Sequence, residues 1–313
     1  MSLRYLLFRM CLCLCFSFLI NVQIFAQDST LIVGGEKVLD RNTAEYKHSV
    51  RLLVEAKFSD SNDVPEDIRG KSTGWRCSGV IIETDVVLTA AHCLPDTILI
   101  NYQGGQREVS VDINSIESFF RLSPRDDVAF GMLDSGWVRH ESYQDDWLDR
   151  TSNVWNPRQP INDIALVFLS EAIPEDKEPV RWRSDLSNRF APGQPVILTG
   201  YGRTLSTNPF ELPELRKVTI PFIEDLQNNQ EFYAGFGNSK NPRTITSPKG
   251  GCNGDSGGPA FINENGEYTL VGITVRGPGN QSGGCAASVT ILTSVSDYVD
   301  WIGKRISRFS SDL

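Results

Sequence analysis

The stretch Gly250-Gly251-Cys252-Asn253-Gly254-Asp255-Ser256-Gly257-Gly258-Pro259 places one serine among five glycines and beside one acid. Glycine permits positive φ angles and close backbone approach, so such a loop can aim several amide N–H groups at one point. A serine hydroxyl is a weak nucleophile at neutral pH. It needs a general base, a group that orients this base, and donors for the developing oxyanion. The stretch predicts that Ser256 is a nucleophile whose partners lie elsewhere in the chain.

The first 26 residues differ from the rest of the chain. Arg4 and Arg9 are their only charges, residues 10–20 are apolar, and the small residue Ala26 ends the segment. This pattern predicts a signal peptide over residues 1–26, and therefore a secreted or periplasmic protein. A membrane anchor is the alternative, but the apolar run is shorter than the ~20 residues that span a bilayer. No stable membrane anchor is expected.

Four cysteines remain after the predicted signal peptide: Cys77, Cys93, Cys252 and Cys285. An even number in an exported chain predicts two disulfides, and four cysteines allow three pairings. A Cys77–Cys93 bridge would close a loop of about 17 residues and stabilise the fold by about 3 kcal/mol in the chain-entropy model. A zinc site is the alternative, but the spacings lack any C-x2-C or H-x3-H pair, so no metal is expected.

The chain without its predicted signal peptide is acidic. It holds 28 Lys and Arg against 39 Asp and Glu, a formal charge of about −11 with neutral histidines. Such a charge argues against nucleic acid as a partner. A length of about 280 residues exceeds what one small core usually holds, so two packed halves are expected.

Short strands separated by turn signals make up most of the chain, which predicts an all-β fold of antiparallel barrels or sandwiches. Residues 77–93 contain two β-branched runs around a polar turn and predict a hairpin, and residues 164–169 predict a buried strand directly after Asp163. Further strands are expected over residues 45–54, 196–198, 215–223, 260–262, 269–275 and 289–292.

A helix is expected only at the C-terminus. Apolar residues recur at helical spacing from Val295 to Ile306, and Ser294 with Asp297 matches a capping box. Residues 55–74 and 121–160 are polar and predict surface loops. Acidic residues in the first loop could bind calcium, but they lack the alternating spacing of a calcium loop. These residues are Asp60, Asp63, Glu66 and Asp67.

His92, Asp163 and Ser256 follow in this order, within the motifs Thr89-Ala90-Ala91-His92-Cys93, Asn162-Asp163-Ile164-Ala165-Leu166 and Gly254-Asp255-Ser256-Gly257-Gly258. Together with Ile32-Val33-Gly34-Gly35, these motifs resemble the chymotrypsin-like (trypsin-fold) serine endopeptidases, and the resemblance runs from Ile32 to the final helix.

The resemblance implies two packed antiparallel six-stranded β-barrels with a C-terminal α-helix, over residues 32–313, behind a signal peptide (1–26) and a short activation peptide (27–31). The implied activity is peptide-bond hydrolysis of the EC 3.4.21 type, without cofactors. Proteins or peptides are the implied substrates, protein inhibitors are further candidate partners, and a monomer is expected.

The resemblance also implies a role for each residue of the motifs. His92 is the general base and acid, Asp163 orients it, and the amides of Gly254 and Ser256 form the oxyanion hole. Asp255 pairs with the α-amino group of Ile32 after cleavage, which makes the uncut chain a zymogen. Cys252 and Cys285 match the family bridge that ties the serine loop to the pocket wall.

The residues matched to the specificity pocket argue against cleavage after Arg or Lys. Gly250 stands at the floor, where trypsin-like members carry an aspartate, and Gly277 and Thr290 form the walls. A threonine there makes the pocket shallow and predicts small or medium aliphatic residues at P1, with broad selectivity. Leu31 precedes Ile32, which suggests that the enzyme cuts its own Leu31–Ile32 bond.

Two positions depart from the family pattern. Val275 and Arg276 stand where members usually have a serine that donates to the triad aspartate and a tryptophan that lines the substrate groove. We therefore expect Asp163 to lose one donor and the subsites beside the pocket to change.

Two other functions are considered. Residues 254–258 also fit the G-x-S-x-G motif of α/β-hydrolase esterases, but that fold needs a histidine after the serine, and all three histidines precede Ser256. His48 and His140 are interpreted as structural. The non-enzyme alternative is a catalytically inactive trypsin-fold binding module, a pseudoprotease. Such proteins generally lose a triad residue, whereas all three are present here.

Overall fold

The computed structural model describes residues 31–122, 131–143, 148–149, 154–155, 162–182, 190–203, 213–226, 230–237, 249–277 and 289–311. The predicted signal peptide, residues 27–30 of the predicted activation peptide and Cys285 lie outside these ranges.

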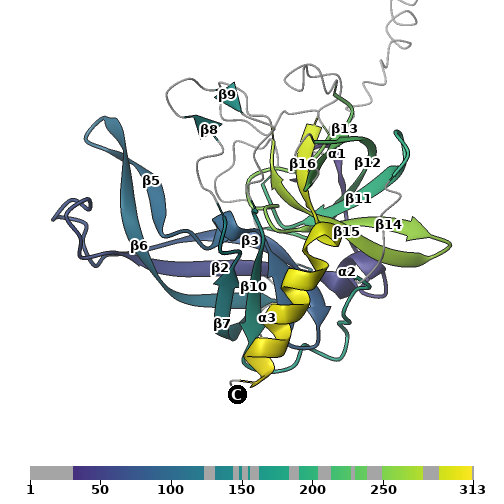
Figure 1. The fold of residues 1–313 in the computed structure, drawn as a ribbon, viewed down its shortest axis with the longest axis horizontal. Helices are drawn as coiled ribbons and strands as arrows, with labels where there is room; N and C mark the ends of the chain where they lie inside the picture. Colours follow the sequence, from purple (N-terminus) through teal and green to yellow (C-terminus); the bar gives the residue numbers. More distant parts are fainter. Residues whose placement is uncertain are drawn as a thin grey trace, which may run out of the picture.

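The N-terminal half forms an antiparallel sheet that curls back on itself. Its strands pair in the order β2-β3-β4-β10-β7-β6-β5, and β2 also pairs with β6, so that six of the strands close into a barrel. β5 and the adjoining part of β6 form a hairpin that projects from this barrel (Figure 1). The strands are β2 (Ser49–Phe58), β3 (Ser72–Glu83), β4 (Val86–Thr89), β5 (Thr97–Tyr102), β6 (Gly105–Phe119), β7 (Gly131–Arg139) and β10 (Ala165–Leu169).

The C-terminal half forms a second antiparallel barrel. Its strands pair in the order β1-β12-β11-β14-β15-β16-β13, and the additional pairing of β12 with β13 closes six of them into a ring. The strands are β1 (Glu36–Lys37), β11 (Pro195–Gly200), β12 (Arg216–Asp225), β13 (Glu231–Gly235), β14 (Pro259–Glu264), β15 (Glu267–Arg276) and β16 (Val289–Ser294). The predicted fold of two six-stranded barrels is confirmed.

The two barrels share one hydrophobic core. The largest cluster of buried side chains includes Leu88 and Leu166 of the N-terminal barrel together with Phe261 and Ile273 of the C-terminal barrel. A second cluster fills the C-terminal barrel itself. Apolar burial stabilises folded chains at roughly 25 cal/mol per Å², so a core common to both halves holds them together.

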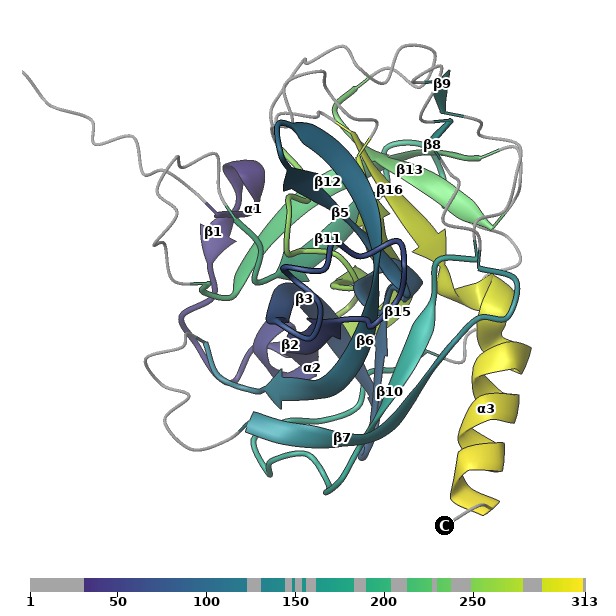
Figure 2. The same ribbon diagram turned by 90° about the vertical axis from the view of Figure 1, so that its left-hand side faces the viewer.

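The C-terminal helix follows the second barrel but packs on the first. It starts as a 3-10 turn, η2 (Val295–Tyr298), and continues as α3 (Val299–Ser311). α3 runs alongside β7 and β10 (Figures 1 and 2), where Phe309 stacks on Phe168 with ring centroids 3.7 Å apart. This cover explains why β10 is buried at all five positions, as the continuous apolar run predicts.

The predicted capping box is wrong in detail, although the helix itself is confirmed. Ser294 is the N-cap of η2, but its side chain makes no capping hydrogen bond, and its hydroxyl lies 3.1 Å from that of Ser296 instead. The tighter first turn changes which groups a cap can reach. In the described part of the chain, no helix is long and apolar enough to cross a membrane.

Three other predictions also need correction. The strand expected over residues 45–54 begins only at Ser49. Residues 44–48 form the helix α2 (Ala44–His48), because the Thr43 hydroxyl accepts a hydrogen bond from the amide of Tyr46 and caps a helical turn. The polar loop expected over 55–74 is shorter, because β2 extends to Phe58 and β3 begins at Ser72. Residues 131–139 form β7 rather than part of a loop, because they pair with both β6 and β10.

The acidic loop between β2 and β3 uses its carboxylates to bind neighbouring strands. Asp63 accepts hydrogen bonds from Ser61 and from the amide of Ser110, and Asp67 accepts one of 2.6 Å from the Tyr102 hydroxyl. These bonds attach the loop to the β5–β6 hairpin. The remaining short elements are α1 (Leu31–Gly34), η1 (Ala91–Cys93), β8 (Leu148–Asp149) and β9 (Val154–Trp155).

A disulfide joins Cys77 of β3 to Cys93 of η1, as one of the three possible pairings predicts. The Trp75 indole N–H also donates to the Cys93 carbonyl oxygen over 2.8 Å. Both contacts attach the short η1 helix to the neighbouring strand. They therefore restrict where the residue between Ala91 and Cys93 can lie.

We expect the double variant Cys77→Ala, Cys93→Ala to lose about 3 kcal/mol of unfolding free energy, because a loop of this length is no longer closed in the unfolded chain. Guanidinium unfolding of the variant and the wild type measures the difference. An unchanged midpoint at an unchanged slope would contradict this expectation.

Candidate active site

Strand register brings His92 and Asp163 together. β10 pairs antiparallel with β4, with Ala165 opposite Thr89, so the residues just before β10 lie beside those just after β4. Asp163 precedes β10, and His92 lies in η1 after β4. The Nδ1 atom of His92 is 2.7 Å from Oδ2 of Asp163, and the His92 amide donates to Oδ1 over 2.9 Å.

Asn162 turns the chain into position before Asp163. Its φ angle is 53°, in the left-handed region that asparagine tolerates better than most residues. Its side chain donates to the Ser142 carbonyl oxygen (2.9 Å) and accepts from the Tyr298 hydroxyl (3.1 Å). The Thr293 hydroxyl also donates to the carbonyl oxygen of Asp163. Both halves of the molecule therefore hold this aspartate.

The Asp163 carboxyl group is buried, with 3% of its side chain exposed. Burial by itself would raise its pKa, but the charge of His92 and the two hydrogen bonds from His92 outweigh burial and hold the pKa below its usual value. The carboxylate is thus ionised and can accept the imidazole N–H. No side chain at position 275 can donate to it, because the residue there is valine.

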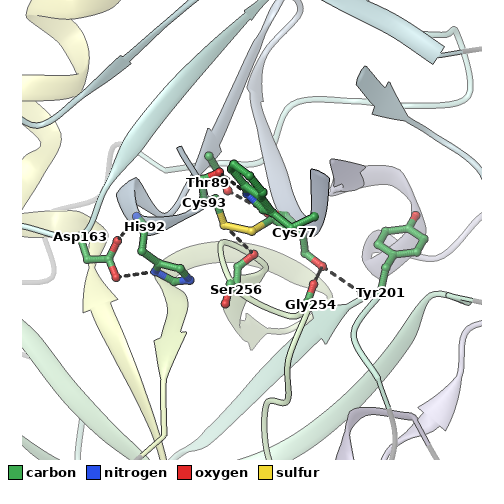
Figure 3. The surroundings of a disulfide bond; sticks show 10 residues. Cys77, Thr89, His92, Cys93, Asp163, Tyr201, Gly254 and Ser256 are labelled. Atoms are coloured by element: carbon green, nitrogen blue, oxygen red, sulfur yellow. Dashed lines mark hydrogen bonds and ion pairs between the residues drawn. A yellow bond between two sulfur atoms is a disulfide. The ribbon is translucent and has the colours of Figure 1, made fainter. Parts of the chain in front are cut away.

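The glycine-rich loop places Ser256 beside His92. Figure 3 shows the imidazole ring lying between Asp163 and Ser256. The loop is attached to both barrels, because the Ser78 amide donates to the Ser256 carbonyl oxygen (2.8 Å) and the Gly257 amide donates to that of Thr274 (2.7 Å). Position 257 must be glycine: its φ angle is +78°, and a Cβ atom would come within 2.0 Å of Thr89 Oγ1.

Two backbone amides of the serine loop differ from their neighbours. Within the described residues, the amides of Gly254 and Ser256 donate no hydrogen bond, whereas those of Asp255, Gly257 and Gly258 donate to Cys252, Thr274 and Asp255. Backbone N–H groups left unused in a folded loop can stabilise negative charge. The resemblance assigns these two amides to the oxyanion hole, and that assignment stays a prediction.

Asp255 points away from His92 into the interior. Its carboxylate accepts hydrogen bonds from the amides of Gly202 (2.7 Å) and Cys252 (2.8 Å). Burial raises the pKa of Asp255 to about 7, and these two bonds offset only part of that effect. The nitrogen of Ile32 is a peptide nitrogen in the uncut chain, and its side chain is buried in the C-terminal barrel core. The ion pair between Ile32 and Asp255 therefore stays a prediction.

The residues assigned to the specificity pocket lie on neighbouring segments. Gly250 is buried and directly precedes Gly251, whose amide donates to the Thr290 hydroxyl over 3.0 Å. Thr290 lies on β16 with 2% of its surface exposed, and Gly277 directly follows β15. Cys252 is disulfide-bonded, but its predicted partner Cys285 lies outside the described residues.

The structure shows a buried ion pair that the sequence analysis missed. Arg276 turns its guanidinium inwards and makes two hydrogen bonds to Glu231, at 2.6 and 2.8 Å. Their side chains are 5% and 2% exposed. The two residues are 45 positions apart, and β16 lies between their strands β13 and β15 in the sheet, so no local sequence pattern signals the pair.

The other two histidines have structural surroundings. His48 Nδ1 lies 2.8 Å from the Glu178 carbonyl oxygen, and burial lowers the pKa of His48. The His140 ring packs against Tyr298 and Trp301, with centroids 5.4 and 5.2 Å apart. The sulfurs of Cys77 and Cys93 lie near the His92 ring, but their disulfide leaves no thiolate for a metal.

Comparisons with known proteins show which family the chain resembles. The trypsin family model matches residues 59–302. The chain is 28% identical to chymotrypsin-C of Bos taurus over 89% of this chain and 90% of that protein. It is 29% identical to trypsin II-P29 of Gallus gallus, over 79% and 86% of the two chains. Phenoloxidase-activating factor 3 of Holotrichia diomphalia is 27% identical, over 90% and 74%.

A solved structure described as HL collagenase shares the fold, with a TM-score of 0.59, 18% identity, and coverage of 88% of this chain and 99% of that one. The family model covers most of the chain, and its matched segment contains all three residues of the His92, Asp163 and Ser256 constellation. The chain therefore belongs to the trypsin family of serine endopeptidases, hydrolases of the EC 3.4.21 type.

Proposed function

We propose that His92, Asp163 and Ser256 are the catalytic triad with which this endopeptidase hydrolyses protein substrates. The observation that carries the proposal is the 2.7 Å contact between His92 Nδ1 and the buried Asp163 carboxylate, on a ring that faces Ser256. The unused amides of Gly254 and Ser256 support it. No residue of this set requires a cofactor.

The chemistry follows from these positions. Ser256 Oγ attacks the carbonyl carbon of the scissile bond, and its proton passes to Nε2 of His92. The amides of Gly254 and Ser256 hold the oxyanion, and each donor contributes about 3 kcal/mol of transition-state stabilisation. The C–N bond then breaks as His92 protonates the leaving amine. Water, deprotonated by His92, cleaves the acyl ester and restores the serine. Asp163 keeps the Nδ1 proton in place and stabilises the imidazolium.

We expect Ser256→Ala to abolish hydrolysis of a fluorogenic peptide, and Asp163→Asn to lower kcat about 10⁴-fold, a magnitude carried over from well-studied members of the family. Asp60→Asn, on an exposed loop carboxylate, is the control and should leave kcat unchanged. Labelling by a fluorophosphonate tests the pseudoprotease alternative. A folded, matured wild type that is neither labelled nor active would favour a binding module.

We further propose that the protein is exported, to the periplasm or outside the cell, and is made as a zymogen cut before Ile32. The predicted signal peptide over residues 1–26, with its apolar run at 10–20, supports export. Ile32 has a φ angle of 40°, which a β-branched residue rarely adopts, so cleavage there would release strain. The buried Asp255 carboxyl group supports activation, because the released amine would give it a cation.

Asp255 gives the uncut chain a specific pH dependence. The folded chain keeps a proton on Asp255 up to about pH 7, whereas an unfolded aspartate releases it near 3.8. Unfolding free energy should therefore fall as pH rises across this window, by up to about 4 kcal/mol. Urea unfolding of an uncut Ser256→Ala chain from pH 4 to 8 measures this.

The uncut Ser256→Ala chain that also carries Asp255→Asn is the control. Its unfolding free energy should lack the fall attributed to Asp255, because a side-chain amide does not titrate. Parallel pH curves for the two chains would contradict the prediction. An amine bound to Asp255 after cleavage should also remove the decline.

We propose that the substrate pocket rejects Arg and Lys and prefers small or medium aliphatic P1 residues. Gly250 supplies no carboxylate, and the Thr290 side chain reaches Gly251 next to it. Thr290→Gly should raise kcat/KM for a Phe P1 substrate relative to an Ala one by tenfold or more, since pocket space for one methylene is worth about 1–3 kcal/mol.

Thr290→Ser is the matched control, because it keeps the hydroxyl bonded to Gly251 and removes only the methyl group. It should give an intermediate ratio. A peptide-library profile of the wild type dominated by cleavage after Arg or Lys would overturn the pocket assignment.

A further inference from the structure

Ser78 of β3 is buried at the contact between the two barrels, and its hydroxyl is used twice. The Oγ atom donates a hydrogen bond to the Gly254 carbonyl oxygen (2.8 Å) and accepts one from the Tyr201 amide (2.9 Å). Gly254 and Tyr201 belong to segments of the C-terminal half, and Figure 3 shows Gly254 just below Cys77 and Tyr201 to its right. The single proton of the hydroxyl and one of its lone pairs therefore connect two segments of the other barrel.

The backbone of Ser78 contacts the same loop. Its amide donates to the Ser256 carbonyl oxygen (2.8 Å), and its own carbonyl oxygen accepts from the Thr89 hydroxyl (2.9 Å). One residue thus holds both Gly254 and Ser256. Its neighbour Cys77 is bridged to Cys93, next to His92. The strand that anchors the general base also anchors the loop of the nucleophile.

Gly254 needs such an anchor. Its φ angle is +97°, and glycine has more backbone freedom than any other residue, so the peptide groups on either side of it can rotate. Oxyanion donors act only when they already point at the developing charge, and loss of one costs 10²–10³-fold in kcat. The bond from Ser78 restrains rotation about the Cα–C bond of Gly254. The peptide group that carries the Gly254 amide is held on its other side, because the Arg203 amide donates to the Asn253 carbonyl oxygen over 2.8 Å.

We propose that Ser78 is a positioning residue for the oxyanion hole, which acts by fixing the carbonyl of Gly254 so that the amide of Gly254 stays directed at the reacting carbonyl. This inference rests on the proposed function, because it assumes that Gly254 and Ser256 supply the oxyanion donors. Ser78 acts through the loop and not on the substrate, because its hydroxyl is buried and already bonded on both sides.

The test compares Ser78→Ala with Ser118→Ala. Ser118 is buried on β6 of the same barrel, and within the described residues its hydroxyl has no hydrogen-bond partner. Each variant removes one buried hydroxyl, but only Ser78→Ala removes the hydrogen bond to the Gly254 carbonyl oxygen. Hydrolysis of a fluorogenic peptide is measured well below the unfolding temperature of each variant, and two inhibitors are compared. A peptide aldehyde forms a tetrahedral adduct whose oxygen occupies the oxyanion hole, whereas the matching peptide alcohol does not.

In Ser78→Ala we expect kcat to fall about tenfold, a part of the cost of a missing donor, with KM within twofold of the wild type. Affinity for the aldehyde should fall by the same factor, and affinity for the alcohol should stay unchanged. Ser118→Ala should match the wild type throughout.

Two results would overturn the proposal: kcat of Ser78→Ala within twofold of the wild type, or equal losses of aldehyde and alcohol affinity, which indicate general distortion of the site. The proposed function fails in a different way, if Ser256→Ala hydrolyses the peptide as well as the wild type. That result would remove the oxyanion hole and the role of Ser78 together.

Discussion

The antiparallel pairing of β4 with β10 is the constraint on which the site depends. Its register places Ala165 opposite Thr89, which sets Asp163 against His92 at one end of the pair. β10 is buried on both faces, and a shift by one residue would turn each of its side chains to the opposite face, against neighbours that it does not fit, so the register is strongly specified. The energy of the core thereby fixes a contact between two polar side chains that lie 71 positions apart.

Close approach of the two barrels supplies the third residue. Gly257 fits against Thr89 and Ser78 of the N-terminal barrel only because it has no Cβ. The shared core brings the halves to this distance, and hydrogen bonds across it then determine the conformation of the Ser256 loop. Nucleophile and base thus come from different barrels, and β3 contacts the segments of both, through Ser78 to the Ser256 loop and through Cys77 to Cys93.

Some features of the chain follow from local pattern and others do not. The hairpin over residues 77–93, the buried strand at 164–169 and the C-terminal helix are encoded by composition and spacing, and they were predictable. Residues 45–48 form part of a helix and not the predicted strand, because a single capping contact from Thr43 decides their conformation. Residues 131–139 form a strand within the predicted loop, because pairing with β6 and β10 on its two sides decides their conformation. Neither a capping contact nor pairing with distant strands leaves a periodic pattern in the sequence.

The motifs and their order by themselves established the resemblance to the family, and that resemblance implied the fold of two barrels and the candidate residues His92, Asp163 and Ser256. A resemblance of this kind rests on short stretches whose chemistry is local. Only the tertiary structure decided that Arg276 turns inwards to Glu231 and that the Ser78 hydroxyl binds Gly254. These contacts join segments 45 and 176 positions apart. They exist because barrel closure and packing bring these segments together. A local sequence pattern carries no information about contacts between residues so far apart in the chain.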